Sequence, residues 1–423
     1  TQPNTLFPYT SLFRSTGPLT NPNGAQPKGR RSYTASWFDP IGRTIASADY
    51  GTNGGAALIR PETVPQRSDI VLVSSQRYAA NGESNASIDP MGVDTRWVND
   101  AAGRRVRLIE AACDGKSTCA PKVPNSCNDG ERISEYAYTA DGQLARLTLV
   151  NAVTGNQVTR WVYGTTLTDS GVARRDLLRA KIYPESDDEA APLNNGLDGV
   201  YNRIEYTYNR QGNIVTMKDP NETVHAYAFD LLGRQVADAV TVLGTGVDGA
   251  VRRIATAYEV RGMVLKVTSY DAASAGDVVN EVAYAYDGFG QLTEDAQAHD
   301  GAVDGSTPKV LYAHADGATG NTSRRVSMTY PDGRVILWSY GSEGEMDDVL
   351  SRVHSLTVDG EEHALVSYTY VGAARFVKIV YPEPEIELSY IKAVDQPIGD
   401  AGDPYTGYDR FGRTVDMKWQ DEE

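Results

Sequence analysis

The sequence predicts an all-β protein made of antiparallel β-hairpin repeats that coil into a curved wall. Two observations predict this class. An aromatic, a spacer and an aromatic, followed by Asp or Asn, two free residues and Gly, recur along the chain, as at residues 206–212 and 227–233. The chain also holds 25 Tyr against 7 Phe, together with 40 Gly and 20 Pro, which suits half-buried strands joined by many turns.

Each repeat reads as a strand, a tight turn and a returning strand. Alternation places Tyr206 and Tyr208 on one face of a strand, and Tyr227 and Phe229 on one face of another. Asp or Asn at the first turn position bonds its own backbone, and Gly at the fourth accepts positive φ. One hairpin cannot bury its aromatic face alone, so we expect neighbouring hairpins to stack and pair antiparallel. Strand twist and the hazard of exposed edges should make the array curl.

The chain divides into a leader and an array. Residues 1–30 are rich in Pro, Asn and Gly, and we expect them to be disordered. Within them, residues 6–15 resemble the translation of a sequencing adapter, and we treat them as an artefact. Residues 31–423 form the array, which we expect to continue beyond both ends. Repeats lie at residues 37–43, 89–109, 136–144, 206–236, 258–262, 284–292, 330–340, 368–370 and 408–413.

Loops are expected at residues 51–55, 113–127 and 183–199, because these stretches are rich in turn-forming and polar residues. A single helical turn is expected at residues 174–180. The rest alternates between strands and tight turns, without a sustained helical period.

The charge balance excludes two classes of partner. The formal net charge is -16, so phosphate backbones and anionic lipid surfaces would be repelled. Nothing approaches the ~18 consecutive apolar residues of a membrane-spanning helix. We therefore expect neither nucleic-acid binding nor a membrane span.

The three cysteines, Cys113, Cys119 and Cys127, leave three readings open. One disulfide with an unpaired thiol is the reading we favour, and it would fit an extracytoplasmic setting. Three reduced thiols are the second reading. A zinc site is the third, but it would need a fourth ligand, and no His lies near.

Other chemical signals have structural explanations. Gly115-Lys116-Ser117 matches the end of a phosphate-binding loop, but Glu110 stands where that loop needs Gly. The glycines of residues 244–249 lack the strand-to-helix frame of a dinucleotide site. Acidic residues lie mostly at turn starts, where their side chains bond the backbone. The histidines are scattered along the chain, at His225, His299, His314, His354 and His363.

Two acidic runs could recruit Ca²⁺ through carboxylate oxygens, although we favour solvated loops. They are Asp187-Asp188-Glu189 and Asp347-Asp348. We therefore predict no catalytic residue, no metal site and no cofactor.

A basic residue recurs after the turns and could form a functional stripe. We instead expect each Arg to lie over a neighbouring Tyr ring or to pair with a turn acid, worth about 0.5–1 kcal/mol at an exposed site. These residues are Arg43, Arg104, Arg234 and Arg413.

The pattern Tyr-x-Tyr-Asp-x-x-Gly-Arg resembles the YD repeat of the Rhs and teneurin-like proteins, from about residue 33 onward. The Asp-Pro-x-Gly turn at residues 89–92, followed by Trp97 and Asp100, looks like that family's connector between repeats. The resemblance implies a hairpin ribbon that spirals into a hollow shell. In bacterial members this shell encloses a C-terminal toxin, and in teneurin-like members it is an adhesion scaffold. The family's self-cleaving closing segment is not visible, so Asp89 receives no protease role.

We expect a non-enzymatic scaffold, part of an Rhs-like shell that encapsulates or presents a toxin or effector domain, secreted or on the cell surface. Its partners would be that domain and a secretion or delivery machinery. The alternative is an extracellular module that binds carbohydrate or protein, which an exposed stripe of Trp or Tyr would favour. An enzyme ranks third and would need a cleft with two carboxylates about 5–10 Å apart.

Overall fold

The computed structural model describes residues 29–112, 131–151, 154–184, 186–317, 323–392 and 397–421. Regular structure there is almost entirely β, with strands numbered to β28 beside a short turn of 3-10 helix, η1 (Asn53–Gly55), and one four-residue helix, α1 (Met346–Val349). The predicted all-β class of antiparallel hairpins is thereby confirmed. The expected leader up to residue 28 and the three cysteines lie outside the described residues.

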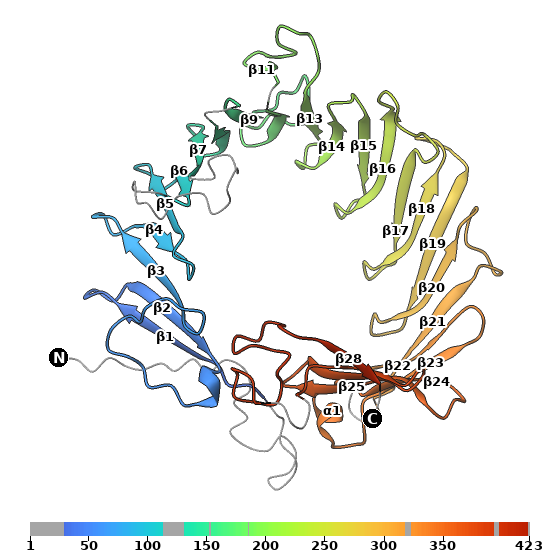
Figure 1. Cartoon of the computed structure of the whole chain (residues 1–423). Coiled ribbons are helices and arrows are strands. Elements are labelled where there is room, and N and C mark those ends of the chain that lie inside the picture. Colours follow the sequence, from blue (N-terminus) through green and yellow to red (C-terminus); the bar gives the residue numbers. More distant parts are fainter. Residues whose placement is uncertain are drawn as a thin grey trace. The chain divides into compact units, whose positions relative to one another are not determined.

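The chain forms two compact units. One takes the residues up to Asp94 together with those from Tyr312 onward, and the other takes Thr95 to Leu311. Strands β5 (Asp94–Asn99) and β21 (Lys309–His314) lie at the limits between the units. Each unit is built from hairpins that follow one another in chain order (Figure 1).

In the second unit every main strand pairs antiparallel with the one before it, and β10 pairs with β13 across a short insertion. The strands are β6 (Arg105–Glu110), β7 (Arg132–Tyr138), β8 (Leu144–Val150), β9 (Gln157–Tyr163), β10 (Leu178–Ile182), β13 (Arg203–Tyr208), β14 (Ile214–Lys218), β15 (Val224–Phe229), β16 (Gln235–Val242), β17 (Arg253–Tyr258), β18 (Val264–Tyr270), β19 (Val278–Tyr286) and β20 (Leu292–Ala298).

The first unit follows the same rule in two chain segments. Its strands are β1 (Tyr33–Phe38), β2 (Thr44–Gly51), β3 (Leu72–Tyr78), β4 (Ser84–Ile88), β22 (Arg325–Thr329), β23 (Val335–Ser339), β24 (Ser355–Val358), β25 (Ala364–Val371), β26 (Arg375–Tyr381), β27 (Ile386–Ser389) and β28 (Lys418–Asp421).

The turns have the geometry that the motif predicts. At Asp230, the N–H of Gly233 donates to the carbonyl of Asp230, and the N–H of Asp230 donates to the carbonyl of Arg234. Gly233 has φ of 78°, which a glycine adopts without steric cost. The strand register shifts between Ala228 and Phe229, just before the turn, as expected where a bulge completes a type I hairpin.

The buried core is made of small clusters along the sheet. In the first repeat Trp37 packs with small and branched residues of β1 to β3, including Ala48 and Val73, which are 1% and 0% exposed. In the last repeats Tyr408 packs with Val371 and Val377. In the first cluster Ala35, Ala46 and Ala48 pack with Trp37 and Tyr50 of the same hairpin.

Two expectations about local structure were wrong. Residues 174–180 form no helical turn: the chain is irregular before it enters β10 at Leu178. The stretch 183–199 is more than a loop, because β11 (Glu189–Ala190) and β12 (Leu193–Asn194) pair as a separate small ribbon. Within this stretch Asp188 and Asn195 are held by the buried Arg203, which the local composition does not reveal.

Candidate functional site

The recurring turns hold their charged side chains in a fixed arrangement, which the Asp230 turn illustrates. One carboxylate oxygen of Asp230 accepts the N–H groups of Leu232 and Arg234, both at 2.9 Å. The other oxygen accepts the Arg234 Nε–H at 2.7 Å. The backbone N–H of Arg234, followed by its guanidinium, holds the pKa of Asp230 below its ordinary value. The anion therefore fixes both the turn and the direction of the arginine.

Arg234 then reaches the next hairpin. Its guanidinium lies over the Tyr258 ring, 4.3 Å from the ring centroid. The Tyr258 hydroxyl donates back to the carbonyl of Gln235, the residue after the arginine, at 3.0 Å. We call this set of contacts, from the turn acid through the arginine to the next tyrosine and back to the backbone, a turn link.

Turn links recur in both units. Arg43 pairs with Asp39 and lies 4.3 Å from the Tyr78 centroid. Arg104 pairs with Asp100 and lies 4.8 Å from that of Tyr138. The hydroxyls of the two tyrosines donate to the carbonyls of Thr44 and Arg105, each at 2.8 Å. The chain is an array of hairpins in which turn links join one hairpin to the next.

All four YD arginines pair with the acid of their own turn, as predicted, and three of them also lie over a tyrosine ring of the next hairpin. At the fourth, Arg413 pairs with Asp409 but lies over Phe411 of its own turn, and its side chain is 64% exposed.

Some links lack the signature letters. Arg352 lies 4.6 Å from the Tyr370 centroid, and the Tyr370 hydroxyl donates to the carbonyl of Val353 at 2.6 Å. Arg324 lies over Tyr340 in the same way, at 4.7 Å. Neither arginine follows a Gly, so the sequence motif alone does not find them. The separation between arginine and tyrosine varies from link to link, from Arg324 and Tyr340 to Arg43 and Tyr78, so no fixed spacing could have served as a signal.

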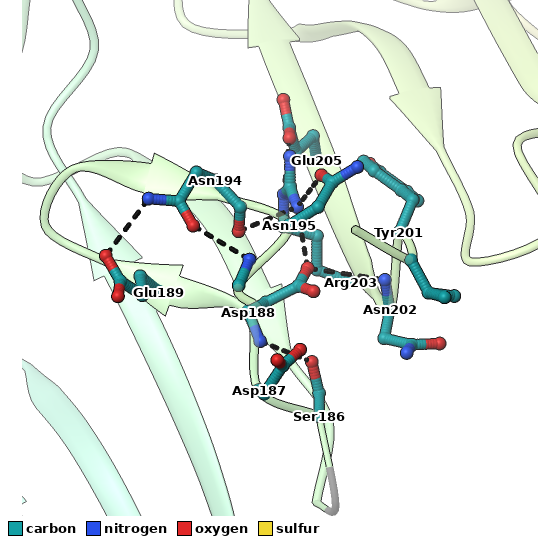
Figure 2. A network of polar contacts seen from close by, with 12 residues as sticks. Ser186, Asp187, Asp188, Glu189, Asn194, Asn195, Tyr201, Asn202, Arg203 and Glu205 are labelled. Carbon is teal, nitrogen blue, oxygen red and sulfur yellow. Dashed lines mark hydrogen bonds and ion pairs between the residues drawn. The ribbon is translucent and has the colours of Figure 1, made fainter. Parts of the chain in front are cut away.

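A second polar site surrounds Arg203, as Figure 2 shows. The Arg203 Nη1 donates to Asp188 Oδ2 at 2.6 Å and to Asn195 Oδ1 at 2.8 Å, and Nε donates to Glu205 at 2.6 Å. The Asp188 and Arg203 side chains are 0% and 8% exposed. This buried pair fixes the β11–β12 ribbon to β13, so Asp188 is not the solvated loop residue that the sequence suggested.

Tyr201 covers this network. Its ring contacts two cations, Arg203 at 4.3 Å and Lys218 at 3.9 Å from the centroid. Burial raises the pKa of its hydroxyl above the ordinary tyrosine range. An open groove lies alongside, lined by Tyr183, Pro184, Ser186, Asn202 and Pro220. None of the described lining residues carries a charged side chain.

The candidate Ca²⁺ carboxylates have other partners. Asp187 accepts the N–H groups of Leu197 and Asp198. Asp347 pairs with Arg352, and Asp348 pairs with Arg324. Within the described ranges no group of three or more His, Cys, Asp and Glu side chains could hold a metal ion.

Among the histidines, His225 shares a 2.7 Å contact with Asp238 and stacks on Tyr227, which fits the packed role expected for it. Gly115-Lys116-Ser117 and the three cysteines lie outside the described residues, so the three readings of those cysteines stay predictions.

Comparison with known proteins yields structural likenesses only. No family model and no curated protein matches the chain. A crystal structure of TcdB2-TccC3 without the hypervariable C-terminal region aligns with TM-score 0.49 and 12% identity over 92% of this chain and 21% of that one. TcdB2-TccC3-TEV gives 0.48 and 14% over 92% and 19%, and the Photorhabdus luminescens Tc holotoxin pore gives 0.48 and 13% over 95% and 21%. The chain spans about a fifth of the length of the chains it matches.

No helix in the described part of the chain is long and apolar enough to cross a membrane.

Proposed function

We propose that this chain is a non-enzymatic scaffold, part of an Rhs-like β-shell that encloses or presents a separate effector domain. The turn link is the observation that carries this proposal. In the links with a complete YD motif, the acid, the arginine and the tyrosine contact one another or the backbone. The recurring polar residues therefore join neighbouring hairpins to each other, as the wall of a shell requires.

Each member of a link is already occupied. The Asp230 carboxylate accepts three hydrogen bonds, and the Arg234 guanidinium is divided between this anion and the Tyr258 ring. The Tyr258 hydroxyl is used by a backbone carbonyl. Groups engaged in this way position neighbouring hairpins, and a catalytic role would require them to be released.

The binding alternative was expected to show an exposed stripe of Trp or Tyr. In the described residues every tyrosine is buried or half-buried. The large aromatic side chains that stand exposed there are Phe38, Phe289, Phe376 and Trp419. No observation favours the binding alternative, and we rank it below the scaffold.

The partners of the scaffold follow from the same proposal. They are an effector domain and the machinery that secretes or delivers it, and the place of action is outside the cell. The structures that match are of TcdB2-TccC3 and of a Tc holotoxin pore, and these names describe those assemblies. The net charge of -16 favours solubility through mutual repulsion of the molecules, which suits a secreted scaffold.

Protease protection tests this function. The chain is produced with any coding sequence that follows Glu423, and the rate at which proteinase K cuts that added segment is compared with the rate for the segment alone. A shell predicts slower cutting in the joined protein, and equal rates would contradict encapsulation.

The wall variant Arg234→Ala should raise the cutting rate, because it removes a turn link. Arg210→Ala is the matched control, since Arg210 is exposed at a turn tip of the same unit. Binding of the intact chain to a glycan array, without protection, would favour the alternative.

A further inference from the structure

The last YD turn of the described chain departs from the others. It keeps the turn geometry, because Asp409 Oδ1 accepts the N–H groups of Phe411 and Arg413, both at 2.9 Å. It also receives a link, with Arg375 over the Tyr408 ring at 4.9 Å. The outgoing chain, however, forms an isolated bridge between Tyr408 and Thr414 and a hydrogen bond from the Val415 N–H to the Gly407 carbonyl, and it then enters β28, which pairs with β27. The turn has been diverted from building a hairpin.

The tip of this turn is half-buried. At the same turn position, Leu231 and Val260 are 105% and 99% exposed, whereas the Arg410 side chain is only 13% exposed. The Arg410 carbonyl accepts the N–H of Thr52, at the end of the first repeat, at 2.9 Å. Its guanidinium contacts Asp400 at 3.2 Å and the carbonyl of Ile70 at 3.4 Å.

Glycines allow two backbones to meet here. A Cβ added to Gly51 would lie 2.2 Å from the Arg410 carbonyl oxygen, and one added to Gly402 would lie 2.3 Å from that of Gly54. Neither position has room for a side chain, because the obstructing atoms are backbone. The contact is therefore shaped for glycine on both sides.

Arg30 adds the charged part of the contact. Its Nε lies 2.7 Å from Asp403 Oδ2, and the two side chains are 11% and 22% exposed. Its Nη1 donates to the carbonyl of Asp409 at 3.0 Å, and its guanidinium lies over the Tyr408 ring at 5.9 Å. A partly desolvated ion pair of this kind gives the contact specificity.

We infer that these contacts form a clasp, in which residues 400–413 lock the last YD turn onto the first repeat at Arg30 and residues 51–55. The paired residues Arg30 and Asp403 are 373 positions apart, so the clasp joins the two chain segments of the first unit. Turns and glycines make it, in place of a strand ladder. It can therefore open while the hairpins on either side stay folded. The inference of a clasp does not depend on the proposal that the chain encloses an effector.

Hydrogen exchange on the full chain tests the clasp. Gly51→Ala introduces the clash with Arg410, and Gly92→Ala is the matched control. Both glycines have positive φ, 54° and 85°, but nothing lies within 4 Å of a Cβ at Gly92. Gly51→Ala should lower protection of the Thr52 amide by about tenfold or more, while β22 and β23 keep theirs. If Gly92→Ala lowered protection of the Thr52 amide as much as Gly51→Ala does, the inference of a clasp would be wrong, because backbone strain alone would then explain the loss of protection.

A charge exchange gives a second, independent readout. Asp403→Arg should deprotect residues 50–56 and 400–413, and adding Arg30→Asp should restore part of that protection. Spin labels at the exposed positions Ile41 and Ile398, with the three cysteines replaced, should report one narrow distance distribution in the parent and a broad distribution in Asp403→Arg. A distance distribution unchanged by Asp403→Arg would overturn the inference.

Discussion

Two substitutions of Tyr208 should weaken the pairing of β10 with β13 to different extents. Tyr208 is 6% exposed, and its hydroxyl donates to the Leu178 carbonyl at 2.6 Å. Tyr208→Phe removes this hydrogen bond and should cost about 1 kcal/mol. Tyr208→Ala also removes the ring and leaves a cavity, so it should cost about 3–5 kcal/mol.

The array is not expected to unfold in one step, so the assay must be local. Native-state hydrogen exchange, read in peptides from β10 and β13, reports the free energy of opening at this site. Phe289→Ala is the control, because Phe289 is 79% exposed and its loss should cost less than about 0.5 kcal/mol. If Tyr208→Ala left exchange in β10 and β13 at the parental rate, the packing argument would be refuted.

Three further predictions concern charge. Arg203→Ala leaves Asp188 buried without its cation, so opening of the β11–β12 ribbon should become easier by about 3–5 kcal/mol, measured by exchange in residues 186–203. Asp230 has a lowered pKa in the fold, so its contribution is present above its ordinary pKa of about 4 and is lost as pH falls through the folded value. As the pH falls, the Asp230 turn should therefore open before the Asn209 turn, whose uncharged amide oxygen accepts the same backbone hydrogen bonds. NMR signals of the two turns report their opening, and simultaneous opening would contradict this reasoning. Burial raises the pKa of Tyr370 to about 12, so its contribution to folding stability is complete below pH about 10 and is lost as the pH rises from there to about 12. A titration that follows tyrosinate absorbance should lose one late-ionising group in Tyr370→Phe, and a titration curve without that loss would contradict the prediction.

The repeat itself was predictable from sequence because its determinants are local. Asp230 bonds the N–H groups of Leu232 and Arg234, and Gly233 supplies the positive φ, all within five residues. The aromatic alternation before the turn fixes the strand face in the same short window. The acid partner of Arg234 was predictable in the same way, because Asp230 lies four residues before it, whereas the Tyr258 ring comes from the next hairpin.

The rest depends on residues that meet across long separations. Asp188 reads as part of a polar loop until Arg203, 15 positions later, is known to lie beside it. One exception is local: Glu222 has φ of 63° at the turn position where other turns have Gly, so a search for that Gly does not find this turn. The clasp is hidden for the same reason as Asp188: the 408–413 motif looks like another repeat, and only its distance to Gly51 shows otherwise.

A double-mutant cycle on Arg234 and Tyr258 tests the turn link most directly. Local opening free energies of β16 and β17 are measured by hydrogen exchange for Arg234→Ala, Tyr258→Ala and the double variant. The link predicts that the two losses overlap, with a coupling energy of about 0.5–1 kcal/mol or more. Losses that add to within about 0.3 kcal/mol would mean that the arginine and the tyrosine act independently, and that the turns do not hold neighbouring hairpins together.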